Sequence, residues 1–523
     1  MNELLLTTSL LQPAKLYPNK PALICGETRY SYGQFFERVQ RVANGLTGLG
    51  LAKGDRVATL MLNCHRYLEL YYATAFAGLV VNPLNIRLAA PELVYILNDS
   101  ASLALAVDDA FLPLLQAIKG QIPSVGTLIY VGSHEVPQGM VHYEALLESG
   151  SATTPKVDLR EDDLAGIFYT GGTTGNPKGV MLSHRNLTCN AYNTMALGLY
   201  NSSDVYLHAA PMFHLANGAA MYTVTWLGGT HTFVKAFEPK AVLETVQRER
   251  VTVSIWVPVM ISAIINYPDF ARYDISSLRR MTYGASPIPV EVLRKAMRML
   301  GCEFGQGYGM TEASPLVTVL KPEDHVTDGP PAQVRRLASC GREIIGVQVR
   351  IVNEAGEDVA PGEVGEIIIR GPNIMQGYWN KPEETAEVLR EGWYHSGDMG
   401  CFDEERFIFL VDRRKDMIVS GGENIYSTEV ENAIYSHPAV LEAAVIGVPD
   451  ERWGEAVKAV VVLRPGHTLS SEEVIEHCRR QIAGYKLPKS VDFAAALPKS
   501  GAGKILKREL REPYWAGYQR RIH

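Results

Sequence analysis

The chain has 523 residues, of which 46% are hydrophobic and 20% are charged, an ordinary globular composition with room for about three domains. Its 50 basic and 57 acidic side chains give a net charge of −7, so we expect no nucleic acid partner. The seven scattered cysteines never form C-x-x-C, which argues against a zinc site or a disulfide framework and favours a reducing, cytoplasmic location.

The start of the chain lacks the basic, apolar and small-residue regions of a signal peptide. The longest apolar stretch, residues 73–81, is too short to span a bilayer. We therefore expect no transmembrane segment.

Helix and strand patterns alternate along most of the chain. Residues 30–50 have apolar side chains at helical spacing, and residues 55–62 form a compact apolar strand followed by another helical pattern. Residues 164–170, 254–258 and 279–286 are further apolar strands that end in turn residues. This alternation predicts an α/β fold with largely buried sheets.

Ligands of open α/β sheets bind beyond the carboxyl ends of the strands. Three residues follow or end predicted strands and are candidates for that rim: Thr170, Gly284 and Gly305.

The pattern changes after residue 320. Residues 346–372 have the order strand, glycine-rich turn, strand, which predicts a small antiparallel β unit. Four charged residues, 412–415, then interrupt two apolar runs. We therefore predict a large N-terminal domain over residues 1–411, with two α/β subdomains and a small β unit, a hinge at 412–415, and a small α+β C-terminal domain over residues 416–523.

The stretch YTGGTTGNPKG, residues 169–179, has the composition of a phosphate site. Its glycines let backbone N–H groups approach an anion, its threonines add donors, and Lys178 adds a positive charge. It does not match the P-loop pattern G-x-x-x-x-G-K-[ST], because Gly179 follows Lys178. Taken alone, the stretch fits a phosphate loop and a plain solvated loop equally well.

Two later segments offer oxygen and aromatic groups. GQGYGMTEASP, residues 305–315, contains Tyr308 for stacking on a ring and Glu312 as a ligand for Mg²⁺, although a strand-to-helix turn explains it more simply. GWYHSGDMG, residues 392–400, contains Asp398, which can accept from both hydroxyls of a ribose or serve as an ordinary turn residue.

Two single residues have simple explanations when taken alone. Lys504 lies in the glycine-rich LPKSGAGKILKREL, where a lysine is usually plain surface. His214 in PMFHLANG can be a base or a ligand, but a lone histidine between Phe and Leu is more often half-buried and satisfied. Neither H-E-x-x-H nor G-x-S-x-G occurs, so zinc-protease and α/β-hydrolase chemistry is not indicated.

Taken together, these segments resemble the adenylate-forming superfamily of acyl-CoA synthetases, luciferases and peptide-synthetase adenylation domains. The order along the chain is that of the family: YTGGTTGNPKG, PMFHLANG, YGASPIP, GYGMTEASP, GYWNKPEET with GWYHSGDMG, DRRKDMIVSGGENIY, and PKSGAGKILKREL. Seven ordered motifs over nearly the whole chain are far more specific than any one of them, and they reverse the simpler explanations above.

The resemblance implies a reaction in two halves. Members of the family let a carboxylate attack the α-phosphate of ATP, which gives an acyl adenylate and pyrophosphate, and a thiol then displaces AMP. ATP, Mg²⁺ and coenzyme A as co-substrate are the implied cofactors. Such chemistry needs charge neutralisation and positioning more than acid–base catalysis.

The resemblance also implies the nucleotide-binding residues. The β- and γ-phosphates are held by Thr170, Gly171, Gly172, Thr173, Thr174, Gly175 and Lys178. The adenosine is bound by Gly284, Ala285, Ser286, Tyr308, Gly309, Asp398 and Arg413. Within this group Tyr308 stacks on the base, and Asp398 and Arg413 grip the ribose.

The catalytic roles implied by the resemblance fall on three residues. Lys504 reaches the substrate carboxylate and the α-phosphate, Thr311 contacts the α-phosphate, and Glu312 holds Mg²⁺. The final motif often reads T-G-K in the family, whereas alanine precedes the glycine here; the lysine is still in place.

The second half-reaction implies a movement of the small domain. Lys415 fits the hinge of the family, about which Lys504 swings out after adenylation. Gly421 and Gly422 then line the passage for the pantetheine arm of coenzyme A.

The substrate pocket is expected to contain His214, Leu215, Ala216, Trp256, Gly284, Gly307, Met310 and Pro315. This set offers no acidic residue to pair an amino acid's ammonium, and no Arg or Lys to pair a second carboxylate. We therefore expect a small-molecule monocarboxylic acid with an apolar body, a fatty acid first and an aryl or cinnamate-type acid second.

Two other functions within the superfamily stay open at this point. One is a stand-alone adenylating enzyme that loads a carrier protein, and the other is a luciferase-type oxygenase. We expect a monomer or a homodimer.

Overall fold

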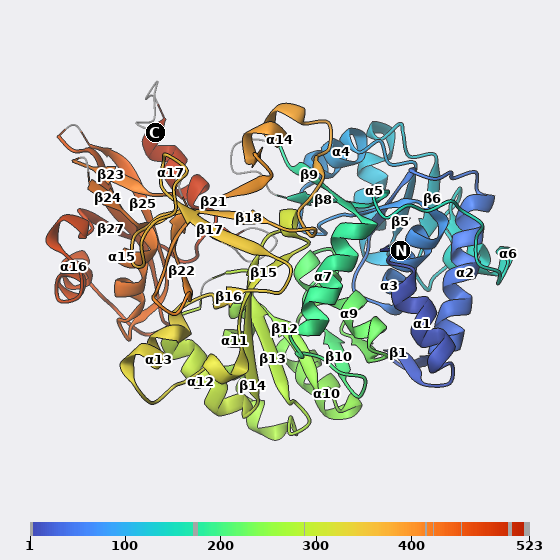
Figure 1. Cartoon of the computed structure of the whole chain (residues 1–523), viewed down its shortest axis with the longest axis horizontal. Helices are drawn as coiled ribbons and strands as arrows, with labels where there is room; N and C mark the ends of the chain where they lie inside the picture. The colour runs from blue at the N-terminus through green and yellow to red at the C-terminus, as the bar shows by residue number, and fades with distance from the viewer. Residues whose placement is uncertain are drawn as a thin grey trace.

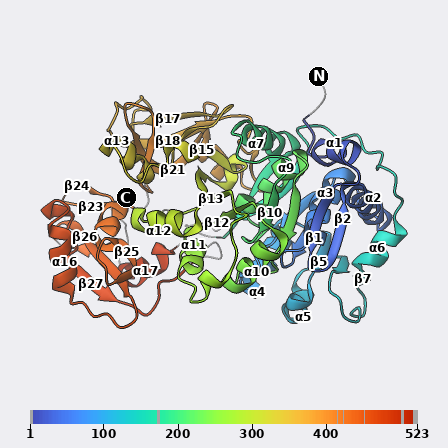
Figure 2. The same cartoon turned by 90° about the horizontal axis from the view of Figure 1, so that it is seen from below.

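A computed structural model of the chain describes residues 4–170, 176–286, 288–413, 416–421, 423–450, 452–499 and 505–516. Within these residues the chain forms four β-sheets with helices packed around them (Figure 1). Three sheets belong to a large N-terminal domain and the fourth to a small C-terminal domain. These two parts lie at opposite ends of the long axis in both views (Figure 2).

The first sheet has eight strands in the order β19-β9-β8-β4-β3-β5-β6-β7. Their bounds are β3 (Arg56–Leu60), β4 (Val80–Pro83), β5 (Ala104–Val107), β6 (Thr127–Tyr130), β7 (Val141–His142), β8 (Leu164–Thr170), β9 (Lys178–Ser183) and β19 (Gly377–Tyr378). Every residue of β4 and β5 is buried, as expected for parallel strands with helices on both faces.

The helices around this sheet come from the same part of the chain. They are α2 (Tyr32–Gly48), α3 (His65–Ala77), α4 (Ala90–Asp99), α5 (Leu112–Ile118) and α6 (Tyr143–Ser149). The first of them begins with a capping box, in which Ser31 and Gln34 each satisfy the other's backbone N–H. It buries Phe35, Val39 and Val42, the helical stripe that the sequence predicts.

The second sheet has nine strands in the order β16-β15-β14-β13-β12-β10-β11-β1-β2. They are β1 (Pro21–Cys25), β2 (Thr28–Ser31), β10 (Val205–His208), β11 (Thr230–Phe233), β12 (Val253–Trp256), β13 (Arg280–Gly284), β14 (Glu303–Gly309), β15 (Leu316–Leu320) and β16 (Arg342–Glu343). The first two strands of the chain thus join the edge of the second sheet, through parallel pairing of β1 with β11.

The helices around the second sheet include the one that follows the phosphate-loop hairpin. They are α1 (Thr8–Leu16), α7 (His184–Ala196), α8 (Leu215–Gly218), α9 (Ala220–Trp226), α10 (Pro239–Glu249), α11 (Pro258–Ile265) and α12 (Val290–Leu300). Apolar residues of α10, α11 and α12 form one core cluster with Trp256 and Tyr283 of the sheet.

The small third sheet is antiparallel and confirms the expected β unit. Its strands are β17 (Gln348–Val352), β18 (Gly365–Arg370), β20 (Leu389–Arg390), β21 (Trp393–Phe402) and β22 (Ile408–Arg413). In the sequence, helix α14 (Pro382–Val388) follows β19 of the first sheet and precedes β20 of the third sheet.

The fourth sheet and its helices form the C-terminal domain. The strands are β23 (Ile418–Ser420), β24 (Glu423–Ile425), β25 (Val440–Asp450), β26 (Gly454–Leu463) and β27 (Ser490–Phe493). The helices are α15 (Ser427–Tyr435), α16 (Ser471–Arg479) and α17 (Lys507–Trp515). The predicted α/β class and the large-plus-small arrangement are therefore confirmed.

One expectation about the sheet rim was wrong. Gly305 lies inside β14, which continues to Gly309. The glycines of this strand serve close packing rather than a turn, because a Cβ at Gly307 would lie 2.8 Å from the side chain of Leu316 and one at Gly309 would lie 1.8 Å from the carbonyl oxygen of Pro315. The rim of this sheet accordingly begins beyond Gly309.

None of the helices in the described ranges is both long enough and apolar enough to cross a bilayer. All seven cysteines are free thiols.

Several histidines are buried in the N-terminal domain and are held neutral. Burial lowers the pKa of His325 from its usual 6.5 to about 4, and that of His208 to about 3. His325 bonds the carbonyl oxygen of Lys321 at 2.8 Å through Nδ1 and the hydroxyl of Tyr283 at 3.1 Å through Nε2.

Because the folded-state pKa of His325 lies below the unfolded value, its contribution to stability is full above pH 6.5 and is lost as the pH falls towards 4. We expect a loss of about 2 kcal/mol from this residue between pH 7 and pH 5. The melting temperature of His325→Gln should therefore fall less over that interval than that of the wild type. His134→Gln, at an exposed histidine, is the control and should fall as the wild type does.

Candidate active site

The predicted phosphate loop connects two antiparallel strands of the first sheet. Strands β8 and β9 pair up to Thr170 and Lys178, so the loop is the turn of a hairpin and does not lead into a helix. This arrangement differs from the strand–loop–helix of a P-loop and agrees with the missing sequence pattern. Gly171, Gly172, Thr173, Thr174 and Gly175 lie outside the described residues, and their phosphate role stays a prediction.

The two ends of this hairpin are held by aromatic residues. The hydroxyl of Tyr169 donates to Oδ2 of Asp99 at 2.6 Å, at the end of α4. On the other strand, Nζ of Lys178 lies 5.0 Å from the ring centroid of Tyr378, a cation–π distance. Lys178 therefore has a defined aromatic neighbour that the sequence did not suggest.

The predicted adenine pocket lies at the ends of β13 and β14. A Cβ at Gly284 would lie 2.1 Å from the carbonyl oxygen of Gly307, so the two strands come too close for any side chain there. Ala285 follows with a φ of +67° and an exposed side chain, and Ser286 is half-buried. The adenine-binding role of these three residues stays a prediction.

The two residues predicted to grip the ribose, Asp398 and Arg413, meet the residue predicted to stack on the base, Tyr308. The hydroxyl of Tyr308 donates to Oδ2 of Asp398 at 2.9 Å, and Nε of Arg413 lies 3.2 Å from Oδ1 of the same carboxylate. Asp398 on β21 is the register partner of Arg413 on β22. Burial raises the pKa of Tyr308 well above its usual value, which keeps the phenol protonated and donating.

The predicted metal ligand, Glu312, lies in a short 3-10 helix, η4 (Thr311–Ala313), directly after β14. Its Oε1 accepts a hydrogen bond of 2.9 Å from the hydroxyl of Tyr378, and its carbonyl oxygen accepts one of 2.8 Å from the backbone N–H of Met375. A half-buried carboxylate in a defined orientation fits Mg²⁺, which commonly takes one or two carboxylates and completes its shell with phosphate and water oxygens.

The residues predicted for the substrate pocket fall into two groups. Leu215 and Met310 belong to the same apolar cluster as Tyr308. His214 precedes α8, with its ring 4.6 Å from that of Phe213. Trp256 instead belongs to the cluster under α10, α11 and α12, and has no exposed surface.

Three other predicted pocket residues lie near Leu215 or Met310 in the sequence and are partly accessible to solvent. Ala216, Gly307 and Pro315 are half-buried. Leu215, Met310 and Tyr308 thus share one apolar cluster, and the substrate-binding role of all the predicted pocket residues stays a prediction.

The C-terminal domain contributes a predicted coenzyme A residue with an aromatic neighbour. Gly421 has a φ of +62°, and a Cβ there would lie 2.7 Å from the ring of Trp453. The indole is exposed, and the guanidinium of Arg452 lies 4.6 Å from its ring. Lys415, Gly422 and Lys504 lie outside the described residues.

A buried charged cluster fixes the helix that follows the predicted catalytic lysine. Nζ of Lys507 on α17 lies 2.8 Å from Oε1 of Glu431 and donates to the hydroxyl of Ser427. Oδ2 of Asp412 accepts from that hydroxyl at 2.7 Å and from the backbone N–H of the same serine. Burial raises the pKa of both Asp412 and Glu431. This cluster ties α17 and α15 to the last strand of the third sheet.

Sequence reasoning missed two residues of this region. Tyr378 stands in the motif GYWNKPEET, where its aromatic ring between glycine and tryptophan was the available signal. Trp453 stands in ERWGE, and an isolated tryptophan among charged residues was its signal. Neither pattern indicates which distant residue the ring will meet.

Comparison with known proteins agrees with this geometry. The model of the AMP-binding enzyme family matches residues 10–379, and that of the AMP-binding enzyme C-terminal domain matches residues 429–504. A feruloyl-CoA synthase of Amycolatopsis sp. is 42% identical over 96% of this chain and 97% of its own. A long-chain-fatty-acid–CoA ligase of Mycobacterium tuberculosis is 36% identical over 97% of this chain and 98% of its own.

A solved structure has the same fold over the same length. The o-succinylbenzoate CoA synthetase of Bacillus subtilis, in complex with its acyl-adenylate intermediate, is 30% identical, with a TM-score of 0.83 over 96% of this chain and 97% of that one.

The chain therefore belongs to the AMP-binding enzyme family. Within that family it is an acid–thiol ligase of the AMP-forming kind, which uses ATP to adenylate a carboxylic acid and then transfers the acyl group to coenzyme A.

The bond from Tyr308 to Asp398 gives a direct test of the ribose site. Tyr308→Phe removes the donor that orients the carboxylate, at a cost of about 1 kcal/mol for one hydrogen bond. We expect KM for ATP to rise roughly five-fold with little change in KM for the acid. Tyr130→Phe removes a tyrosine–carboxylate bond to Asp109 in the first sheet and is the matched control. Equal KM values for ATP in Tyr308→Phe and wild type would contradict this placement.

Proposed function

We propose that the acid adenylated by this enzyme is an aromatic, apolar monocarboxylate of the cinnamate type. The observation that carries the proposal is the pair of rings of Phe213 and His214, 4.6 Å apart and tilted by 47°, in which Phe213 belongs to the same apolar cluster as Leu215 and Met310; aromatic and apolar side chains thus adjoin each other there. None of the eight predicted pocket residues is Lys or Arg, which favours a single carboxylate. The 42% identity to a feruloyl-CoA synthase supports the same choice.

A fatty acid is the second candidate. The 36% identity to a long-chain-fatty-acid–CoA ligase supports it. Against it, Trp256 fills the end of β12 with no exposed surface, so a long alkyl chain directed there would have to displace the indole.

The first half-reaction is carried mainly by groups that bind and orient. The hairpin turn with Lys178 binds the β- and γ-phosphates, and Asp398 with Arg413 orients the ribose. Glu312 would hold Mg²⁺, which would supply positive charge against the phosphates and the departing pyrophosphate. Thr311 and Lys504 stabilise the α-phosphate as the carboxylate oxygen attacks and pyrophosphate departs.

The second half-reaction uses the mobile C-terminal domain. We place the domain boundary at residues 412–415, with Lys415 as hinge. The change of sheet between Arg413 at the end of β22 and Ile418 at the start of β23 supports this boundary. Coenzyme A then enters along Gly421 and Gly422, where the exposed indole of Trp453 is suited to contact it.

We further infer a cytoplasmic location, which the seven free thiols support, and a monomer or homodimer as the working assembly.

A pyrophosphate-release screen over carboxylic acids tests the substrate. We expect kcat/KM for hydroxylated cinnamates to exceed that for fatty acids of any chain length by at least about ten-fold, which corresponds to about 1.4 kcal/mol of differential binding. Each acid is measured with and without coenzyme A, with the CoA ester identified by mass. A preference for a medium or long fatty acid would establish the second candidate instead.

Replacement of the proposed catalytic lysine separates the two half-reactions. Lys504→Ala should lower adenylation by roughly 10²–10³, because a charge on the reacting phosphate is lost, yet should spare thiolysis of a supplied acyl adenylate. Lys499→Ala is the matched control, since that lysine lies in the same motif and pairs with Glu442 on the surface. A parallel fall of both half-reactions in Lys504→Ala would contradict the two-conformation assignment.

A further inference from the structure

Tyr378 contacts two groups of the nucleotide site that come from different sheets. Its hydroxyl donates to Oε1 of Glu312 at 2.9 Å, in the helix η4 that connects β14 and β15 of the second sheet. Its ring centroid lies 5.0 Å from Nζ of Lys178, in β9 of the first sheet. One side chain thus meets both a carboxylate and an ammonium that are 134 residues apart in sequence, 312 − 178.

The backbone of Tyr378 is fixed to the phosphate-loop hairpin. Strand β19 pairs with β9, with Tyr378 opposite Val180, and the backbone N–H of Trp379 donates to the carbonyl oxygen of Gly179 at 2.7 Å. The backbone N–H of Tyr378 donates to Oγ1 of Thr385 at 2.9 Å. The ring itself is buried, so packing against the surrounding protein fixes its position.

The residues that precede Tyr378 are fixed to the other partner. The side-chain amide of Asn373 donates to the carbonyl oxygen of Ala313 at 2.7 Å, and Met375 donates its N–H to that of Glu312 at 2.8 Å. The hydroxyl of Ser314 donates to the carbonyl oxygen of Asn373 at 2.7 Å. Residues 373–379 therefore form a bridge from η4 to β9, and Tyr378 is the side chain at its end.

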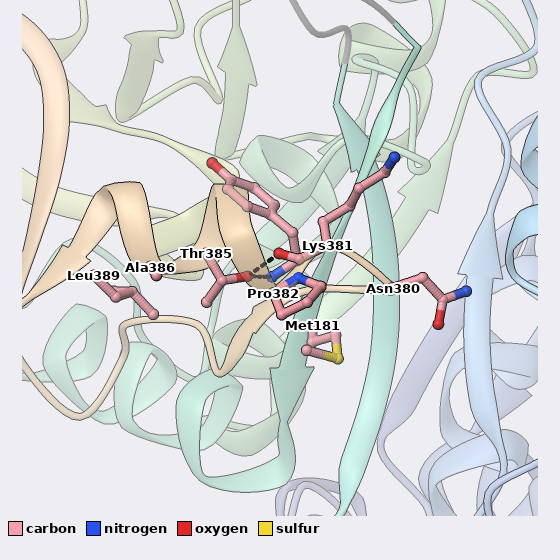
Figure 3. A pocket seen from close by; sticks show the side chains of 8 residues that line it. Met181, Asn380, Lys381, Pro382, Thr385, Ala386 and Leu389 are labelled. Carbon is pink, nitrogen blue, oxygen red and sulfur yellow. Dashed lines mark hydrogen bonds between the residues drawn. The ribbon is translucent and has the colours of Figure 1, made fainter.

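A pocket lies on the far side of this bridge, between β9 and α14 (Figure 3). Met181 of β9 points towards Pro382, and Thr385 bonds back to the carbonyl oxygen of Lys381 at 2.7 Å. The pocket shares Tyr378 with the bridge and shares no residue with the predicted acyl pocket.

A second tyrosine extends the contact to the third sheet. Tyr394 on β21, also buried, lies beside Tyr378. Strand β21 carries Asp398 as well. Tyr378 therefore lies between the strand of the ribose site and the predicted metal ligand, to which its hydroxyl donates.

From this geometry we propose that Tyr378 is a positioning residue for magnesium-bound ATP, resting on the proposed role of Glu312 as the magnesium ligand. Its hydroxyl donates to one oxygen of Glu312 and so orients the carboxylate that would hold the cation. Its ring holds the ammonium of Lys178 at a fixed separation from that carboxylate. Lys178 would bind the triphosphate directly, and Glu312 would bind it through the metal. A single side chain therefore fixes the positions of these two charged groups relative to each other.

The test measures binding in the absence of the acid, so that no turnover occurs. ATP affinity is determined by calorimetry for the full chain, once with excess Mg²⁺ and once with a chelator. For Tyr378→Phe, which keeps the ring, we expect a five- to ten-fold loss of affinity for ATP with Mg²⁺ and unchanged affinity for metal-free ATP. For Tyr378→Leu, which removes the ring as well, both affinities should fall.

Two further variants make the result decisive. Tyr394→Phe should give a smaller loss in the same direction, since it removes a polar neighbour of Tyr378 and leaves the bond to Glu312 in place. Tyr514→Phe is the matched control, because it removes a tyrosine–carboxylate bond of 2.8 Å to Asp492 on the C-terminal domain. Wild-type affinity of Tyr378→Phe for ATP with Mg²⁺, in a folded protein, would overturn the proposal.

Glu312→Gln separates this proposal from the function on which it rests. If Glu312→Gln lowers affinity for ATP with Mg²⁺ and Tyr378→Phe does not, Glu312 keeps its role and the positioning role of Tyr378 is wrong. If neither Glu312→Gln nor Tyr378→Phe changes the magnesium dependence, the metal role of Glu312 is wrong and the proposal falls with it.

Discussion

The hydrogen bond from Tyr308 to Asp398 joins the second sheet to the third, and the nucleotide site depends on that junction. Each sheet alone offers only part of a site: β14 supplies an aromatic ring and backbone, and β21 with β22 supplies a carboxylate and a guanidinium. A buried carboxylate is stable only when its oxygens are satisfied, and Asp398 is satisfied by one partner from each sheet. The same contacts therefore stabilise the interface and orient the group predicted to bind the ribose.

The site is assembled at the edges of the three large-domain sheets rather than within any one of them. The first sheet contributes the hairpin with Lys178, and the second contributes Glu312 just after β14. Residues 373–379 connect the two, through bonds to η4 on one side and to β9 on the other. This fits a reaction in which phosphate charge must be neutralised from several directions at once, because one element cannot surround a triphosphate.

The C-terminal domain is attached to this assembly by charge as well as by chain. Asp412 at the end of the third sheet accepts from Ser427 on α15, and Lys507 on α17 meets Glu431 in the same buried cluster. Burying such a cluster costs free energy. Removal of one partner strongly destabilises the folded protein, because a buried charge is then left unpaired. The cluster therefore holds α17, which begins three residues after the predicted catalytic lysine, in a defined position on its own domain.

The sequence by itself determined the class of fold, the order of the motifs and the approximate bounds of the few elements that it predicted, because helical and strand periodicity is local: β8 spans the predicted residues 164–170. It also singled out Asp398, Arg413 and Glu312, since their motifs are short and contiguous. Only the tertiary structure decided which motifs meet, that the phosphate loop is the turn of a hairpin, and that Gly305 lies inside a strand. Pairing of Tyr378 with Glu312 and Lys178 depends on strand register between sheets, and no local pattern of residues encodes that distance.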